Sequence, residues 1–339
     1  MIDYDRLNRA YDKKGFYSLQ FEVGDLCYQG CIYCYMNALE TPQNTLSDTD
    51  IRMILENAKK LDITAIEWLG GEPLLRESIF EYMAMSADLD MKNNVWTGGL
   101  PLSENSVVEN VAQYARNGLI SVHVSTINPD LYIKLHPGHS AKDIDIILNG
   151  IRELLHLGYP ASQLLNSVTF TGWQSSEDMI ETIDFFESEF NIKTSLNVYH
   201  TYLRPGVSDS ELKKYIPSDE EVENVYLRYS EQWEMEEYPM NCVNKQYCSS
   251  TIAVLCDGSV TPCATIREDG APDIHEGQSF YDIANNNRDH LIFGKFRDPS
   301  NLPESCRSCE LSDICFGCRS RSYAAGNGIY GKDPRCFRT

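Results

Sequence analysis

Short stretches of alternating apolar and polar residues are separated, along the first two-thirds of the chain, by longer stretches with helical spacing. Residues 16–23 alternate with period two, which predicts a strand that ends at a cysteine-rich loop. After a capping serine or aspartate at position 47 or 48, the spacing predicts a helix to about residue 60. The apolar face of this helix comprises Ile51, Ile54, Leu55 and Ala58.

The pattern then repeats. We expect further strands near residues 65–69, 92–97, 119–126, 165–171 and 194–202, and further helices near 77–88, 103–117, 141–157 and 176–190. Six strand–helix units in a row predict an α/β fold with a parallel sheet and helices on its outside, because parallel strands need helical crossovers. Reactive groups in such folds gather at the carboxyl ends of the strands. The loops after the first two strands are therefore expected to lie together.

Composition restricts the function. The 339 residues are 42% hydrophobic and 23% charged, as in an ordinary soluble protein. The net charge of -21 argues against nucleic acid as the main partner. No apolar run approaches a membrane span, and the first residues are no signal peptide, so we expect a cytoplasmic protein. Twelve cysteines without an export signal indicate metal or redox chemistry rather than disulfides.

Three of these cysteines, Cys27, Cys31 and Cys34, follow the first predicted strand. Thiols this close along the chain cannot pair with one another without strain, but they can converge on one soft metal centre. A four-iron, four-sulfur cube held by three thiolates keeps one iron open for a substrate. The alternative is structural zinc, which takes four ligands, usually as two C-x2-C pairs.

This spacing, with Tyr33 just before the third cysteine, resembles the radical S-adenosylmethionine (SAM) enzyme superfamily. The resemblance implies a partial (β/α)6 barrel similar to a TIM barrel. It also implies that a [4Fe-4S] cluster on the three cysteines binds SAM at its open iron and cleaves it to a 5′-deoxyadenosyl radical. That radical abstracts a hydrogen atom from the substrate.

The resemblance extends to the loop after the second strand, where Gly70–Gly71–Glu72–Pro73 matches the GGEP motif that holds the amino group of SAM. It implies that Tyr33 packs near adenine, although an aromatic residue here is equally compatible with the core. Ser125 is the candidate for the SAM carboxylate or ribose. Two departures from the family's motifs weaken the assignment of SAM contacts in these loops. Thr97–Gly98–Gly99 replaces the usual Thr-Asn-Gly, and the usual Asp-Gly after Ser125 is absent.

The last third holds all of the remaining cysteines, and all but Cys256 follow the spacing C-x5-C-x14-C, a gap, C-x2-C-x5-C-x2-C, a gap, and C. This order resembles the SPASM extension of radical SAM peptide maturases and anaerobic sulfatase-maturating enzymes. The resemblance implies two auxiliary [4Fe-4S] clusters, hence three clusters in all. The first would be held by Cys242, Cys248, Cys263 and Cys318, and the second by Cys306, Cys309, Cys315 and Cys336.

Some features of this region leave alternatives open. Relatives usually have three residues, not two, between the cysteines that match Cys315 and Cys318, so the interleaving could shift by one ligand. The C-x2-C-x5-C-x2-C part alone also resembles a zinc knuckle. Cys256 belongs to neither set and is expected to be a buried structural thiol. Residues 257–263 predict a hairpin that delivers Cys263.

We expect a barrel over residues 1–206, a helical connector with a solvated acidic face over 207–240, and a SPASM domain over 241–339. His123 is expected to be a hydrogen-bonded structural histidine. The sequence identifies no general base; His200, Tyr202 and Glu67 are candidates, and Arg204 is a candidate carboxylate partner or a surface ion pair.

Three substrate classes fit an oxidative radical SAM enzyme: a peptide or protein that is crosslinked or dehydrogenated, a small alcohol such as a sugar or cyclitol, and a sulfatase converted to formylglycine. The first ranks highest, because most SPASM-bearing relatives act on peptides. Only 26 residues precede Cys27, so leader recognition would need a separate peptide-binding protein or other surfaces, and only three follow Cys336, which ranks sulfatase maturation last. A flavodoxin or ferredoxin is the expected reductant. A non-enzymatic electron carrier would require a dead SAM site, against which the intact motifs argue.

Overall fold

The computed structural model describes residues 2–199, 208–235, 242–288 and 298–338. Its centre is one eight-stranded sheet in the order β6-β5-β4-β3-β2-β1-β7-β8. Strands β1 to β6 are parallel, β7 pairs in parallel with β1, and β8 is antiparallel to β7. The strands are β1 Ser18–Glu22, β2 Ala65–Leu69, β3 Lys92–Thr97, β4 Leu119–His123, β5 Leu164–Phe170, β6 Lys193–Val198, β7 Thr251–Val254 and β8 Val260–Thr261.

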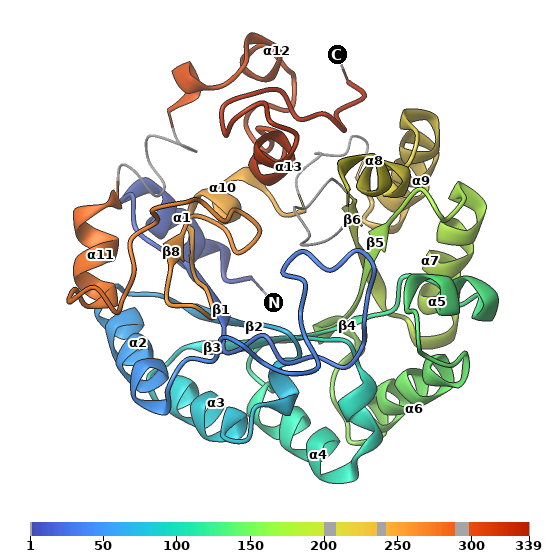
Figure 1. Cartoon of the computed structure of the whole chain (residues 1–339), viewed down its shortest axis with the longest axis horizontal. Helices are drawn as coiled ribbons and strands as arrows, with labels where there is room; N and C mark the ends of the chain where they lie inside the picture. Colours follow the sequence, from blue (N-terminus) through green and yellow to red (C-terminus); the bar gives the residue numbers. More distant parts are fainter. Residues whose placement is uncertain (1, 200–207, 236–241, 289–297, 339) are drawn as a thin grey trace.

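Helices cover the outside of the curved sheet, and Figure 1 shows them as an outer arc. The crossover helices are α2 Asp48–Lys60, α3 Ile79–Asp88, α4 Asn105–Tyr114, α6 Lys142–His156 and α7 Ser176–Phe190. The expected six-unit partial barrel is therefore confirmed. The other helices are α1 Tyr4–Asp12, α5 Pro129–Leu135, α8 Asp209–Leu212, α9 Asp219–Gln232, α10 Lys245–Ser249, α11 Phe280–Asn286, α12 Glu304–Arg307 and α13 Arg319–Ala324.

Helix α2 illustrates why the crossovers form where the sequence predicts them. Ser47 caps it and exchanges hydrogen bonds with Asp50, so two orphan backbone donors are satisfied. Its predicted apolar face is fully buried, together with the outward residues of the strands, such as Phe21 and Trp68. Burying each such large side chain contributes roughly 1.5–3 kcal/mol. The outer layer is therefore fixed by ordinary apolar packing.

The inner face of the sheet is polar. Glu67 on β2 accepts hydrogen bonds from Ser18 on β1 (3.0 Å) and from Asn94 and Trp96 on β3 (both 2.7 Å). The hydroxyl of Tyr247 on α10 also donates to this carboxylate. A chain of polar groups thus links the barrel to the C-terminal third.

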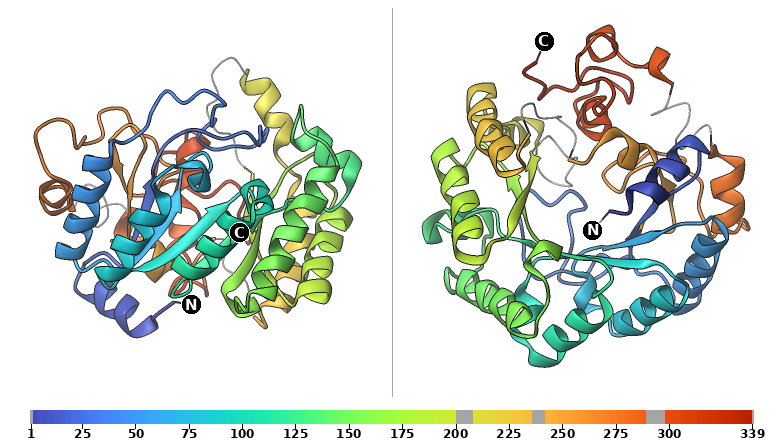
Figure 2. Two further views of the ribbon diagram at one scale, coloured as in Figure 1. Left: turned by 90° about the horizontal axis from the view of Figure 1, so that it is seen from below. Right: turned by 180° about the vertical axis from the view of Figure 1, so that it is seen from behind.

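The C-terminal third adds directly to the barrel rather than standing apart. Residues Ser18 to Phe21 of β1 pair with Thr251 to Val254 of β7. Figures 1 and 2 show the orange and red segments on the side of the barrel left open between β1 and β6. The expected hairpin forms between β7 and β8, and Gly258 adopts φ +98° in its turn.

Helix α9 begins as expected at its cap Ser218, whose side chain accepts from the backbone of Glu221. It is more than a solvated acidic connector, however, because Val222, Val225, Tyr226 and Tyr229 are buried against β5, β6 and α7. In the described ranges no helix is long and apolar enough to cross a membrane.

We predict that Tyr247→Phe loosens the attachment of α10 to the barrel, because Glu67 loses one of its four partners. The free energy of unfolding should fall by about 1–3 kcal/mol, measured by urea denaturation under anaerobic conditions. Tyr281→Phe on α11, where the side chain is 38% exposed, is the control and should leave stability unchanged. Equal stability of the two variants would contradict this role for Glu67.

Candidate active site

The cysteine loop folds back over the carboxyl ends of the strands, where Figure 1 shows it in blue across the middle of the barrel. Its two ends are tied together, since the backbone of Cys27 donates to Leu39 and that of Leu39 to Asp25 (both 2.9 Å). The buried Asp25 carboxylate accepts from the backbones of Gln43 and Asn44 (both 3.0 Å). The loop is thus a closed, internally bonded unit that presents its thiols from fixed backbone.

Cys27, Cys31 and Cys34 lie close enough together to influence one another's ionisation. Burial raises the pKa of Cys31 well above its usual range, and the neighbouring thiols Cys34 and Cys27 raise it further. Burial raises the pKa of Cys27 to about 12, with Glu72 and Cys34 adding to the effect. Backbone N–H groups of Gln29 and Ala38 lie 3.5 Å from the sulfurs of Cys27 and Cys34. Cys27 and Cys31 therefore stay protonated until a cationic centre binds the loop's thiols.

Whether the group of three thiols suits a single ion or a cluster depends on how closely its ligands come together. In the described part of the chain, no three cysteine, histidine or acidic side chains come together tightly enough to hold one metal ion. An iron–sulfur cube binds each thiolate through a different iron, which spaces the sulfurs more widely than mononuclear zinc does. Three thiols from one closed loop therefore fit the ligands of a four-iron cluster, which binds each thiolate through a different iron.

The glycine loop after β2 is bonded directly to the cysteine loop. The backbone of Gly71 donates to Gly24 and that of Glu72 to Leu26, both at 2.8 Å. A Cβ atom at Gly71 would lie 2.2 Å from the carbonyl oxygen of Leu26, and one at Gly70, which has φ +138°, would lie 2.6 Å from that of Gly24. Both glycines are thus required for the close approach of the two loops, whatever they also offer a ligand.

Glu72 is a buried carboxylate held in one position. It accepts from the hydroxyl of Thr97 (2.9 Å) and from the backbones of Leu74 (3.1 Å) and Gly98 (2.7 Å). Burial raises the pKa of Glu72 to about 7, while these hydrogen bonds act in the opposite direction. A ligand ammonium beside it would favour the ionised form, which suits the binding of an amino group.

Gly98, in the loop after β3, stands where relatives commonly have asparagine, and this glycine has a local explanation. A Cβ atom at Gly98 would lie 1.6 Å from the side-chain oxygen of Gln29, whose amide nitrogen donates to the Gly98 carbonyl at 3.2 Å. The cysteine loop thus fills, with its own glutamine, the space that a side chain at position 98 would occupy.

Tyr33 and Ser125 take part in a buried network. The Tyr33 hydroxyl lies 3.0 Å from Nε2 of His136 and 2.9 Å from Nε2 of His123, and the hydroxyl of Ser125 lies 2.9 Å from the same His123 nitrogen. Because Nδ1 of His136 faces the carbonyl of Tyr132 at 3.0 Å, it carries the proton, and Nε2 accepts from Tyr33. Burial lowers the pKa of His123 to about 3, so this histidine is neutral and hydrogen-bonded, as expected.

The Tyr33 ring packs in an apolar cluster with Leu131, Leu135 and Tyr199. The Oγ atom of Ser125 also accepts from the backbone of Thr169 at 3.0 Å, and the residue is fully buried. Both side chains are therefore held in the interior around the cysteine loop, and the contacts of Tyr33 with adenine and of Ser125 with the SAM carboxylate or ribose stay predictions.

The C-terminal cysteines fall into two groups of four. Burial raises the pKa of Cys248 well above its usual range, and its neighbours Cys242, Cys263 and Cys318 raise it further. A second pocket brings together four other thiols, and its lining includes Cys306, Cys309, Cys315 and Cys336. Burial likewise raises the pKa of Cys336, to which Cys315 and Cys309 add. These groups coincide with the two ligand sets that the family resemblance implies.

Cys256 lies outside both groups and is buried, as expected. Its backbone donates to Glu22 at 3.2 Å. Glu22 also accepts from the hydroxyl of Tyr35 at 3.0 Å and pairs with Arg267 at 2.6 Å. These residues tie the cysteine loop to the C-terminal third, and nothing in the sequence pattern singled out Glu22, Gln29 or Arg267.

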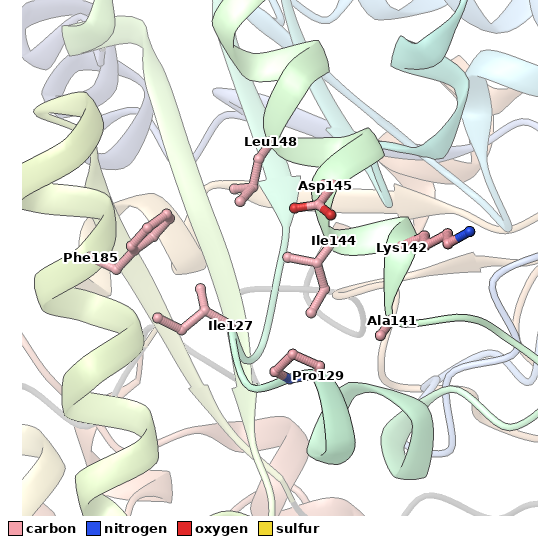
Figure 3. A pocket seen from close by; sticks show the side chains of 8 residues that line it. All are labelled: Ile127, Pro129, Ala141, Lys142, Ile144, Asp145, Leu148 and Phe185. Atoms are coloured by element: carbon pink, nitrogen blue, oxygen red, sulfur yellow. The ribbon is translucent and has the colours of Figure 1, made fainter.

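The structure describes one of the three candidate general bases. Glu67 is committed to its four partners in the inner face, and His200, Tyr202 and Arg204 lie outside the described residues. A mostly apolar pocket, shown in Figure 3, opens between α5, α6 and α7 in the outer layer. Its lining, which includes Ile127, Ile144 and Phe185, contains no cysteine and no residue of the motif loops, so the thiol chemistry is located elsewhere.

Comparisons with known proteins bear on the family and the fold. Residues 21–186 match the family model of the radical SAM superfamily. The chain is 29% identical to GTP 3′,8-cyclase of Campylobacter lari over 54% of its own length. The match covers 57% of that relative, so it spans little more than half of the relative's length. It is 25% identical to a probable GTP 3′,8-cyclase of Methanococcus aeolicus over 76% of its length and 88% of that protein.

Among solved structures, SuiB of Streptococcus suis bound to S-adenosylmethionine superposes with a TM-score of 0.68 at 18% identity, covering 98% of this chain and 81% of SuiB. The anSMEcpe protein with bound AdoMet and the Cp18Cys peptide gives 0.68 at 14% identity, covering 94% and 93%. At these identities the structures establish the shared fold.

We predict that Gly71→Ala disrupts the site, because the added methyl group collides with the backbone of the cysteine loop. SAM cleavage should fall about a hundredfold, as expected for a displacement of about 1 Å, measured as 5′-deoxyadenosine formed by reconstituted protein under reduction. Gly15→Ala, where the nearest atom would be 3.6 Å away, is the control and should retain full activity. Unchanged cleavage in Gly71→Ala would show that the two loops are not coupled as described.

Proposed function

We propose, on the premise that this chain is a radical SAM enzyme with its domain at residues 21–186, that it carries out a net two-electron oxidation of a peptide or protein. The product would be a crosslinked or dehydrogenated residue. The observation that carries the proposal is the sorting of eight C-terminal cysteines into two groups of four beside the SAM site.

In this proposal Cys27, Cys31 and Cys34 hold the initiating [4Fe-4S] cluster, which supplies the electron for SAM cleavage. Glu72 binds the amino group of SAM, and Gly70 and Gly71 keep its backbone against the cysteine loop. Tyr33, with Ser125 and His123 behind it, supports the loop from the interior. These residues orient SAM and exclude water from the reacting region.

Each C-terminal group has four thiols, enough to ligate every iron of a cube. A fully ligated cluster has no open iron and suits electron transfer rather than SAM binding. Two such clusters give a substrate radical a route to lose its second electron. A non-oxidative reaction would have no use for them, which favours oxidation as the reaction class.

The peptide assignment is supported by analogy of fold. A second structure of SuiB is described as bound to precursor peptide SuiA, and it superposes with a TM-score of 0.67 over 98% of this chain. The sequence relatives give a second candidate, cyclisation of GTP, and a small alcohol remains the third. A triphosphate would meet a strongly acidic protein, with a net charge of -21, which disfavours GTP.

We predict about twelve irons per chain in anaerobically reconstituted protein, four for each cysteine group. With a chemical reductant, 5′-deoxyadenosine should form in all preparations. A synthetic peptide with the sequence of a precursor encoded beside the gene should raise the rate of 5′-deoxyadenosine formation. Mass spectrometry should show that the peptide has lost two hydrogens. Stimulation by GTP with formation of a cyclised nucleotide, and none by the peptide, would instead establish the second candidate.

The interleaving of Cys318 can be tested with paired variants. Cys318→Ser should lower the iron content to about eight per chain. Adding Cys248→Ser should leave it at about eight, because both residues belong to one group, whereas adding Cys315→Ser should lower it to about four. A sequential arrangement, with Cys318 in the group of Cys315, predicts the reverse for the two double variants. Cys256→Ser is the control and should keep the full iron content.

A further inference from the structure

Arg319 is the first residue of α13, directly after Cys318, and its side chain is enclosed within the C-terminal third. The residue is only 2% exposed. Its Nη1 donates to the carbonyls of Ile329 (3.1 Å) and Gly331 (2.8 Å). Its Nε and Nη2 are buried and have no hydrogen-bond partner within the described residues.

Arg321, two positions further on, has different hydrogen-bond partners. Arg321, equally buried, donates through Nε and Nη2 to the carboxylate of Asp333 at 2.8–3.2 Å. Across the described ranges, Arg319 forms no ion pair with an acidic side chain. A buried guanidinium without a counter-charge is strongly unfavourable, so Arg319 requires an anion that the carboxylates of the described residues do not provide.

The groups that adjoin Arg319 come from both sets of thiols. Its positive charge opposes the rise that burial causes in the pKa of Cys248, in the first group, and in that of Cys306, in the second. Its guanidinium carbon lies 5.9 Å from the centre of the Phe316 ring. That ring packs in one apolar cluster with Cys248, Cys263 and Cys306. Arg319 therefore lies between the two cysteine groups, within electrostatic range of each.

The backbone makes room for the guanidinium. Gly317 adopts φ +70°, and a Cβ atom there would lie 2.7 Å from Nη2 of Arg319. The shortened link between Cys315 and Cys318 thus passes directly over the unpartnered end of the arginine.

We propose that Arg319 is a counter-cation shared by the two auxiliary iron–sulfur clusters, and that it raises the reduction potential of both. This inference rests on the proposed function, in which each group of four thiols holds a cluster. Four thiolates make each cluster anionic, and a nearby positive charge stabilises the reduced form, which carries one more negative charge. The two unpartnered nitrogens, Nε and Nη2, carry N–H donors of the kind that tune clusters through their sulfurs. Arg319 acts as a positioning and tuning residue and does not contact substrate.

The test compares Arg319→Gln and Arg319→Lys in the full chain carrying Cys27→Ala, Cys31→Ala and Cys34→Ala, so that only auxiliary clusters contribute. Iron content is measured first, then the midpoint potentials by redox titration followed by electron paramagnetic resonance. The control is Arg288→Gln. Arg288 also packs on a ring, Phe16 at 4.9 Å, and donates to a backbone carbonyl, that of Lys14 at 2.8 Å, but adjoins neither cysteine group.

We expect Arg319→Gln to keep about eight irons and to shift both midpoint potentials to more negative values, while Arg319→Lys stays closer to the parent and Arg288→Gln matches it. Unchanged potentials, or a shift in only one cluster, would overturn the shared role. If Arg319→Gln loses iron, Arg319→Lys decides: retention of iron means that the charge holds the clusters, and equal loss means a purely structural role for the carbonyl contacts. A parent protein without about eight irons would refute the auxiliary clusters and, with them, the shared role of Arg319, whereas unchanged potentials in a protein with about eight irons would refute the tuning alone.

Discussion

Thiols that are buried side by side resist ionisation, and this constraint governs the architecture around the active site. Burial raises the pKa of Cys27, Cys31, Cys248 and Cys336, and the neighbouring thiols add to the shift. Such groups are unfavourable as thiolates unless a cationic centre binds them. The fold therefore has to hold them in place before that centre arrives. It does so with rigid backbone: a closed cysteine loop, two glycines packed on that loop, and short helices that each carry a cysteine.

The same constraint explains why the C-terminal third is joined so firmly to the barrel. Strand β7 extends the sheet beyond β1, Tyr247 bonds to Glu67, and Arg267 pairs with the buried Glu22 next to Tyr35 of the cysteine loop. These contacts come from three different segments of the C-terminal third. Breaking the pair at Glu22 would leave a buried carboxylate without its counter-charge, which typically costs about 3–5 kcal/mol. The C-terminal thiol groups are thus fixed relative to the cysteine loop, as electron transfer in the proposed reaction would require.

Local patterns in the sequence predicted what depends on local physics. The six strand–helix units, the buried face of α2, the cap at Ser218 and the turn at Gly258 all follow from periodicity, capping and glycine chemistry. Long-range pairing lies beyond such patterns. The parallel pairing of β7 with β1, the filling of the Gly98 site by Gln29 and the buried face of α9 all depend on residues far apart in the chain. Arg319 is the clearest case, because only its enclosure distinguishes it from a surface arginine.

The short spacing between Cys315 and Cys318 shows how two residues separate two groups of thiols. The Phe316 side chain is buried in the apolar cluster between them, and Gly317 turns the chain through a left-handed conformation. The backbone of Gly317 lies 3.3 Å from the sulfur of Cys315, while that of Cys318 donates to Asp333 at 2.7 Å. Each cysteine is thus anchored to a different partner immediately after the turn. The two groups of thiols are separated because the Phe316 side chain is buried and because Cys315 and Cys318 are held by different partners. A third intervening residue is not needed.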